Sequence, residues 1–300
     1  MTTDIHINTN SIHAWWLAIR PRTLSGAAVP VAVALAAAWA DGSLQALPAC
    51  CCMLFALLMQ IEANLVNDYI DGKQGRDNED RLGPPRACAS GWVTPSAMRR
   101  AIAIVLLPAC LSGLPLIHYG GAGMVAVGLA CIVFCFLYTT LLARKAMGDL
   151  LVLVFFGLVP VCLTYYIQTH TLPLYVVALA LAIGCYTDCL LLVNNYRDMA
   201  QDKACGKITL AVLLGHRRTE LAYLLCGLAA LLFCQALWFT PHVAGAVASW
   251  LLLPVHLITW RKMCAIGYGR ELNTILAATA RQILLLGLLL VAGIVMNPAA

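Results

Sequence analysis

Two stretches of the chain place several aspartates and asparagines on one helix face, at the point where an apolar run ends. The first stretch reads NLVNDYIDGKQGRD and spans residues 64–77. At about 100° per residue, Asn64, Asp68 and Asp71 fall within roughly 60° of one another on a helix. Three oxygen-bearing side chains are therefore expected to point into the same space.

The second stretch repeats this pattern about 130 residues later in the chain. It reads NNYRDMAQDKACGKIT and spans residues 194–209, and its Asn194, Asp198 and Asp202 again share one helix face. Carboxylates gathered in this way repel one another unless a cation offsets their charge. We therefore expect a hard divalent cation as their partner.

Magnesium suits both clusters because it takes oxygen ligands and is usually held by one or two carboxylates together with phosphate groups. Basic residues interleaved with the acids would then bind the remaining phosphate oxygens. These basic residues are Arg81, Arg197, Lys203 and Lys207. The combination predicts a magnesium-dependent clamp for a diphosphate. The alternative, two solvated helix ends, would scatter the charges along the loops instead of aligning them.

The rest of the chain is suited to lipid. Hydrophobic residues make up 62% of the 300 positions, charged residues make up 11%, and the mean hydropathy is +0.84. Runs of about 18 to 25 apolar residues predict about nine membrane-spanning helices. They are expected near 24–41, 47–70, 97–117, 121–141, 147–167, 172–195, 219–239, 242–260 and 274–296. We therefore predict an all-α, polytopic membrane protein whose helices surround a central cavity that opens near the cytoplasmic face, with residues 1–300 forming one domain. Nothing in the chain indicates a nucleic-acid partner.

Basic residues alternate between successive connections. Lysine and arginine occur before the first expected helix and after the second, fourth, sixth and eighth, whereas the intervening turns DGSLQA, HYGG, QTHT and TPH contain neither. Cytoplasmic loops retain lysine and arginine in this way. An odd number of helices then puts the N-terminus in the cytoplasm and the C-terminus outside, in a cell inner (cytoplasmic) membrane. Both acidic clusters face the cytoplasm in this topology.

In this helical setting the two clusters resemble the aspartate-rich motifs of the UbiA superfamily, the intramembrane aromatic prenyltransferases. Within it, the chain is most similar to the 1,4-dihydroxy-2-naphthoate polyprenyltransferases of menaquinone synthesis. The similarity covers nearly the whole chain and is carried by NDYIDGKQGRDNEDRLGPPR, NNYRDMAQDKACGKITLAVLLG, FFGLVPVCLTYY and IRPRTL. The 4-hydroxybenzoate branch usually has a third aspartate where this chain has Gly75, which favours the naphthoate branch.

The resemblance implies roles for individual residues. The magnesium-site and catalytic positions are Asp68, Asp71, Asp198 and Asp202, with Asp77 as a weaker metal ligand. The neighbouring polar, substrate-binding positions are Asn64, Asn67 and Asn194. Tyr138 and Lys145 resemble a tyrosine and a lysine that contact the diphosphate in this family.

The chemistry that the resemblance implies is the transfer of a polyprenyl chain from its diphosphate to 1,4-dihydroxy-2-naphthoate, with loss of carbon dioxide, to give demethylmenaquinone. The allylic cation formed on the way requires a dry pocket with aromatic faces. Candidate aromatic residues are Tyr138, Phe155, Phe156, Tyr165 and Tyr166, and the resemblance adds support for the last two. Each of them is otherwise a packing or interfacial residue.

Several alternatives stay open at this point. The acceptor could be another aromatic acid such as 4-hydroxybenzoate, and the prenyl length and the oligomeric state are not fixed. A transporter is the rival from another class, but it would concentrate polar groups near the membrane midplane, whereas here they crowd one face. Glu62 and Asp188 are intramembrane acids that could contact the aromatic acceptor. Arg281 could hold a substrate carboxylate or extend toward the interface.

Overall fold

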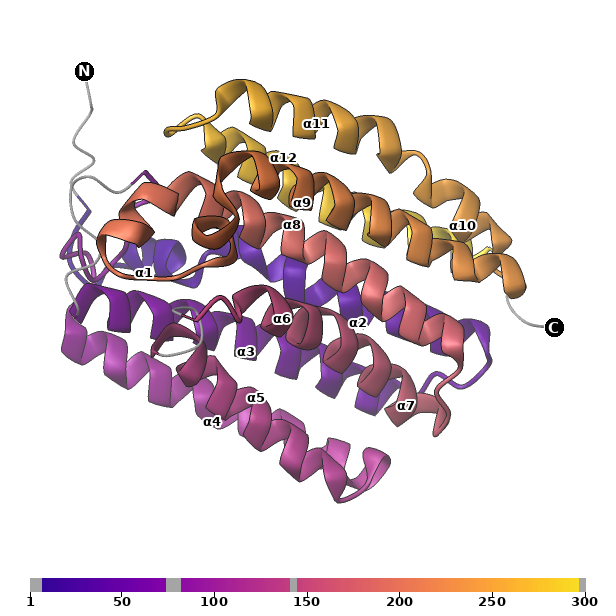
Figure 1. Ribbon diagram of the computed structural model, residues 1–300. Helices are drawn as coiled ribbons and strands as arrows, with labels where there is room; N and C mark the ends of the chain where they lie inside the picture. Colours follow the sequence, from indigo (N-terminus) through magenta and orange to yellow (C-terminus); the bar gives the residue numbers. More distant parts are fainter. Residues whose placement is uncertain (1–6, 74–81, 141–144, 297–300) are drawn as a thin grey trace.

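The computed structural model describes residues 7–73, 82–140 and 145–296. Within these ranges the chain is helical, and its β-type pairing is an isolated bridge between Lys145 and Ile208. The predicted all-α class is therefore confirmed. Figure 1 shows long helices running side by side, with α1 at one end of the bundle and the last turn of α12 at the other.

The helices follow one another with short connections. They are α1 (Ile12–Ile19), η1 (Pro21–Thr23), α2 (Leu24–Ala40), α3 (Ala46–Lys73), α4 (Pro95–Gly120), α5 (Gly123–Thr140), α6 (Gly148–Leu153), η3 (Val154–Leu163), α7 (Thr164–Thr169), α8 (Leu174–Ala204), α9 (Leu210–Cys234), η4 (Gln235–Phe239), α10 (Val243–Ser249), α11 (Leu252–Ile266) and α12 (Leu272–Val295). Eight helical stretches of the described chain are long and apolar enough to cross a membrane, and Gly123–Tyr138 is a shorter apolar helix. The protein is accordingly a multi-pass membrane protein, as the hydropathy predicts.

Two helices extend further than the hydropathy predicts. Helix α8 continues to Ala204, past the expected end near 195, and α9 begins at Leu210 rather than near 219. Both extensions contain polar side chains, so hydropathy does not predict them as helical. At the start of α9, local contacts favour the helix. The Thr209 hydroxyl accepts a hydrogen bond from the Val212 amide at the start of α9, and Gly215, at φ 72°, marks a kink one turn later.

The fifth expected span is not one regular helix. Its middle part, η3, is a ten-residue π-helix that contains Pro160. Proline removes a backbone donor from the helical ladder, and π-helical turns in long helices often occur at functional sites. The wider turn changes which side chains of this span face the interior, with consequences for the aromatic residues described below.

The connections that carry no lysine or arginine meet at one end of the bundle. The Asp41 carboxylate accepts hydrogen bonds from the hydroxyls of Tyr165 and Tyr175, and it lies 4.0 Å from His242 Nε2. The Gln168 side chain accepts the Gln45 amide at 2.7 Å. The turns after α2, α7 and η4 are thereby joined. Because the helices alternate in direction, the basic connections lie at the opposite end.

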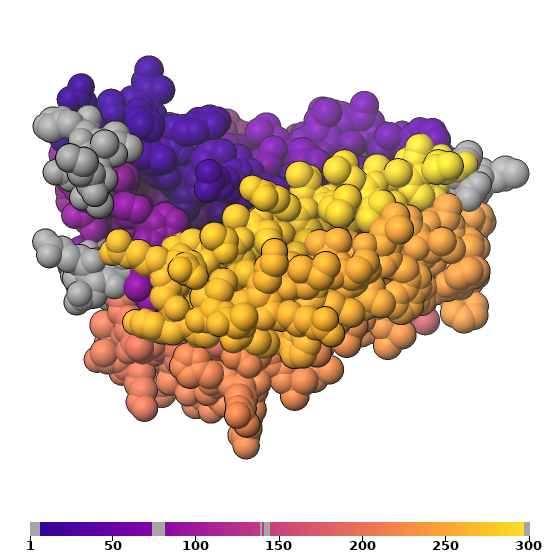
Figure 2. All heavy atoms as spheres, turned by 90° about the horizontal axis from the view of Figure 1, so that it is seen from above, coloured from indigo at the N-terminus to yellow at the C-terminus, as the bar shows by residue number. Residues whose placement is uncertain are grey.

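The centre of the bundle is formed by α2, α8 and α12, which contribute most of the largest buried cluster. Small residues allow close approach between neighbours. A Cβ atom added to Gly157 of η3 would lie 2.5 Å from the Ala180 carbonyl oxygen and 2.9 Å from the Gly184 Cα atom of α8. The C-terminal helices cover one face of the molecule, as seen from above in Figure 2.

This close contact gives a stability prediction. Gly157→Ala forces the π-helix away from α8, and overpacking of this kind costs about 1–3 kcal/mol. We expect a lower midpoint of thermal unfolding in detergent. Gly128→Ala is the matched control, because a Cβ atom there has no neighbour within 4 Å. Equal unfolding midpoints for the two variants would contradict the packing described here.

Candidate functional site

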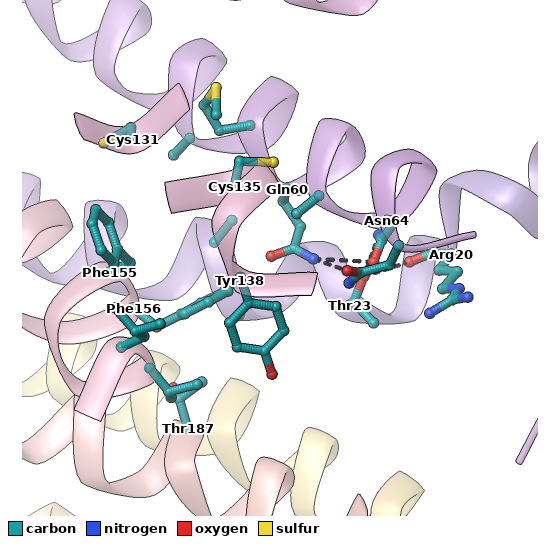
Figure 3. Close-up of a pocket in the computed structure, with 18 of the residues that line it drawn as sticks. Arg20, Thr23, Gln60, Asn64, Cys131, Cys135, Tyr138, Phe155, Phe156 and Thr187 are labelled. Carbon is teal, nitrogen blue, oxygen red and sulfur yellow. Dashed lines mark hydrogen bonds between the residues drawn. The ribbon is translucent and has the colours of Figure 1, made fainter. Parts of the chain in front are cut away.

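A cavity of about 1310 Å³ lies between the helices. Its walls are largely apolar, and α3, α4, α5, η3 and α8 contribute most of them. Figure 3 shows part of the lining, with Phe155, Phe156 and Tyr138 around the apolar portion and Gln60, Asn64 and Arg20 toward the polar end. An apolar cavity with a few convergent polar groups is the usual form of a small-molecule site.

The two acidic clusters converge on this cavity. Asp71 of α3 and Asp198 and Asp202 of α8 all line it. The amide side chains of both clusters join them, and these are Asn64, Asn67 and Asn194. The negative charges of Asp198 and Asp71 both repel that of Asp202. The carboxylates of α3 and α8 therefore lie close enough to interact electrostatically. The structure thus brings together residues about 130 positions apart in the sequence.

Each of these carboxylates has a basic partner. Arg197 binds Asp198 through two nitrogens, at 2.7 and 2.6 Å. Lys207 Nζ lies 3.2 and 3.3 Å from the two Asp202 oxygens, and Arg86 lies 3.4 Å from Asp71. Paired acids and bases of this kind present both metal-binding oxygens and phosphate-binding nitrogens to one space.

Arg197 connects three parts of the chain at this end. Its side chain is 1% exposed and also donates to the side-chain oxygens of Asn194 and Asn273, each at 2.8 Å. Asn273 in turn donates to the Leu82 carbonyl at 2.8 Å, so α8, α12 and the segment after α3 are fastened together. Asn273 was not predicted from the sequence, since it is an isolated polar residue at a helix start with no neighbouring motif.

Asp68 lies beside the cavity and is absent from its lining. Its side chain is 1% exposed, and its two oxygens accept the backbone amides of Ala87 and Cys88 at 2.9 and 2.8 Å. Arg20 lies 3.9 Å away. Burial, reinforced by the Asp68 charge, raises the pKa of the Cys88 thiol to about 12, so the thiol stays neutral beside the carboxylate. Asp68 therefore holds the segment that carries Arg86.

Asn64 anchors the N-terminal segment to α3. Its amide donates to the Ile19 carbonyl at 2.8 Å and to the Thr23 hydroxyl at 2.9 Å, and Gln60 donates to Thr23 and to Asn64 (Figure 3). These contacts hold Arg20 and Arg22 at the cavity. Arg20 is itself the αL residue that ends α1, and Arg22 lies within the short 3₁₀ turn Pro21–Thr23. Hydropathy alone does not reveal this geometry.

Other predicted residues lie elsewhere. Lys145 and Lys203 are exposed and do not line the cavity. Tyr165 is buried at the opposite end of the bundle, bonded to Asp41, whereas Tyr138 does line the cavity. Asp77 and Arg81 lie outside the described residues.

The oxygen-rich end of the cavity is suited to magnesium that is shared with a phosphate. Among the residues that the structure describes, no three His, Cys, Asp or Glu side chains form a complete metal site. Three carboxylates and several amides on one wall match the way in which magnesium is held, by one or two carboxylates plus waters and phosphate oxygens. The donor set therefore fits the predicted cofactor.

The anchoring role of Asp68 is testable. Asp68→Ala removes the acceptor for two amides, and bonds to a charged acceptor contribute about 1.5–3 kcal/mol each. We expect hydrogen exchange at the Ala87 and Cys88 amides to become at least about tenfold faster. Asp71→Ala, one turn along the same helix, is the control and leaves both amides protected. Unchanged exchange in Asp68→Ala would contradict this role.

Comparisons with known proteins agree with this geometry. The 1,4-dihydroxy-2-naphthoate octaprenyltransferase of Escherichia coli is 36% identical over 251 residues, which is 80% of each chain. A UbiA homolog from Aeropyrum pernix has a similar fold, with a TM-score of 0.69 over 93% of this chain and 98% of that one, at 16% identity. A UbiA homolog from Archaeoglobus fulgidus, solved bound to DMAPP and Mg²⁺, gives a TM-score of 0.64 over 93% and 99% of the two chains, at 13% identity.

The decisive match covers most of the sequence. Residues 27–267, which include both acidic clusters and the helices that carry them, match the UbiA prenyltransferase family. The chain therefore belongs to the UbiA prenyltransferase family.

Proposed function

We propose that this prenyltransferase moves a polyprenyl chain from its allylic diphosphate to 1,4-dihydroxy-2-naphthoate, with loss of carbon dioxide, to give demethylmenaquinol, the reduced form of demethylmenaquinone, in menaquinone biosynthesis. The observation that carries the proposal is the convergence of Asp71, Asp198 and Asp202 at the polar end of an otherwise apolar cavity. The name of the Escherichia coli relative supports this acceptor and this transfer. The transport alternative loses support because the charged side chains of the cavity gather at one end of it.

In this proposal the diphosphate lies at the polar end of the cavity. Asp71, Asp198 and Asp202 would hold magnesium, and Asn67 and Asn194 also line the cavity. When bound, magnesium offsets the charge that develops on the departing diphosphate. The Archaeoglobus fulgidus homolog solved with DMAPP and Mg²⁺ supports this cofactor.

Basic side chains of the protein also stabilise the charge on the departing diphosphate. Arg86, Arg197 and Lys207 each pair with one of the three carboxylates, and Arg20 and Arg22 line the same end. Cations fixed before the reaction stabilise developing negative charge without reorganisation. Lys145 and Lys203, at the protein surface, would attract the diphosphate by their charge.

The apolar part of the cavity holds the prenyl chain and protects its cation. Phe155, Phe156 and Tyr138 offer aromatic faces, and the surrounding aliphatic side chains exclude water that would quench the cation. We assign structural roles to Asp68 and Tyr165: Asp68 positions Arg86, and Tyr165 braces the far end of the bundle.

The proposed activity is tested with purified protein in lipid, a radiolabelled polyprenyl diphosphate, and either 1,4-dihydroxy-2-naphthoate or 4-hydroxybenzoate. We expect prenylated product from the naphthoate in the presence of magnesium and none after its removal. Asp198→Asn and Asp202→Asn should each lower turnover at least about 100-fold, because each removes one charge from the cation site. Glu271→Gln, an exposed acid outside the cavity wall, is the control. Product from 4-hydroxybenzoate alone would refute the choice of acceptor.

We further propose an inner-membrane location with the acidic clusters at the cytoplasmic face. The basic connections lie at their end of the bundle, which matches the retention of lysine and arginine in the cytoplasm. A fluorescent-protein fusion to the C-terminus should then stay dark, while an alkaline phosphatase fusion there should be active. A fluorescent C-terminal fusion would reverse the orientation.

A further inference from the structure

Two aspartates outside the diphosphate end have buried oxygens with no hydrogen-bond partner. Both carboxylate oxygens of Asp149, in α6, are buried and unpartnered, and so is Oδ1 of Asp188, in α8. Asp188 is 7% exposed. Unpaired carboxylates at such depth are costly and are usually retained for a function. Neither residue has a place in the diphosphate site described above.

The two acids form a pair. Helices α6 and α8 pack against each other, and across this contact the negative charge of Asp149 acts on Asp188. Two neighbouring carboxyl groups in an apolar setting resist ionising together, so a pair of this kind can hold one proton between them. A pair that holds one proton can accept a second or release the first.

The pair is connected to the main cavity. Asp149 lines a void of about 10 Å³, close to the space of one water molecule, together with Tyr138, Asn195 and Lys207. Those three residues also line the main cavity. The Thr187 hydroxyl, next to Asp188 in the sequence, is buried without a partner on the cavity wall (Figure 3). The void therefore places Asp149 beside three residues of the cavity wall.

In the part of the chain that the structure describes, the titratable groups around the pair come from α5, α8, α9 and the α8–α9 connection. Tyr138 of α5 lies in the field of both acids, and Lys207 approaches from the α8–α9 connection. Cys226 of α9 donates its thiol to Asp188 Oδ2 at 3.8 Å, and Cys185 and Cys189 flank Asp188 on α8. Lys207 is engaged with Asp202, so it does not neutralise the pair.

We propose that Asp149 and Asp188 act as a proton store for the aromatic acceptor, reached through Tyr138 and the water-sized void beside it. The inference rests on the proposed function. The aromatic ring becomes nucleophilic when its hydroxyl loses a proton, and Asp149 is an acid with unpartnered oxygens that shares a void with three residues of the cavity wall. Because they act through Tyr138, the two aspartates are positioning residues.

The proton balance closes without a further reactant. The acceptor O–H bond breaks and its proton moves to Tyr138, whose own proton passes to the Asp149–Asp188 pair. The prenyl carbon leaves the diphosphate oxygen with the bonding electrons remaining on that oxygen, and a bond forms to the ring carbon that bears the carboxylate. Carbon dioxide then leaves, its bonding electrons return to the ring, and the ring oxygen regains the stored proton by the reverse path.

The test compares Asp149→Asn and Asp188→Asn with wild type for turnover of 1,4-dihydroxy-2-naphthoate across pH. Wild-type kcat should fall at low pH, as the pair fills with protons. Each variant should lose about 100-fold in kcat and lose that pH dependence. The KM for the prenyl diphosphate, and its binding measured directly, should stay within about threefold, which a general loss of structure would not allow.

Two further variants make the result decisive. Asp149→Glu should restore at least about a tenth of the activity together with the fall at low pH. Glu62→Gln is the matched control, because Glu62 is another buried acid with two unpartnered oxygens and lies outside the cavity lining. It should keep the wild-type pH dependence.

The outcomes separate the two proposals. Product from the wild type together with an unchanged pH dependence in both Asn variants would overturn the proton store alone. Loss of diphosphate binding in both Asn variants and in Asp149→Glu would also overturn it, since the pair would then be structural. No product from the wild type would overturn the proposed function, and this inference with it.

Discussion

The structure depends on how opposite charges are balanced at the end of an apolar cavity. Carboxylates from α3 and α8 cannot share a low-dielectric wall unless cations lie between them, and Arg197 meets this need most directly. It is almost fully buried, yet Asp198, Asn194 and Asn273 all accept hydrogen bonds from it. A guanidinium offers five donors in a fixed plane, so one side chain can hold α8 and α12 in register while its charge stays satisfied. The contacts that pair the acidic and basic side chains of the site therefore also hold the helices together at this end of the bundle.

The rest of the fold keeps this balance in place by close packing and by polar contacts. The interior between α2, α8 and α12 is built from small apolar residues and from polar residues that satisfy one another. Tyr186 donates to Gln282, which donates to Thr259, and both bonds are 2.7 Å long. At the far end, the Asp41 carboxylate accepts hydrogen bonds from Tyr165 and Tyr175 and lies near His242. Both ends are therefore fastened by polar contacts, while the length between them is held by close packing, in which glycine at 157 and 184 allows two helices to touch.

The sequence predicted the helices and the meeting of the two clusters, because both follow from local periodicity and charge. It could not separate Asp68 from Asp71, which differ by less than a quarter turn around the helix. Their surroundings differ because Asp68 accepts the backbone amides of Ala87 and Cys88, contacts that bridge about twenty residues and leave no trace in the local pattern. Of the aromatic residues predicted for the pocket, Phe155 and Phe156 line the cavity and Tyr165 does not, for a related reason. A π-helix advances less per residue than an α-helix, so the faces of Phe155, Phe156 and Tyr165 could not be derived from regular helical spacing.

The separation of polar and apolar regions within one cavity has a chemical consequence. Breaking the prenyl–oxygen bond creates an anion and a cation at once, and in a uniformly apolar site both would be too costly. In a uniformly polar site, water would capture the cation. The boundary between the Arg197–Asp198 end and the Phe155–Phe156 wall is a place where each charge can form beside its own stabilising groups. Tyr138 lines this cavity, and the charges of Asp71, Asp149, Asp188 and Asp202 all act on it. A proton moved through Tyr138 is therefore moved at the point where the new carbon–carbon bond must form.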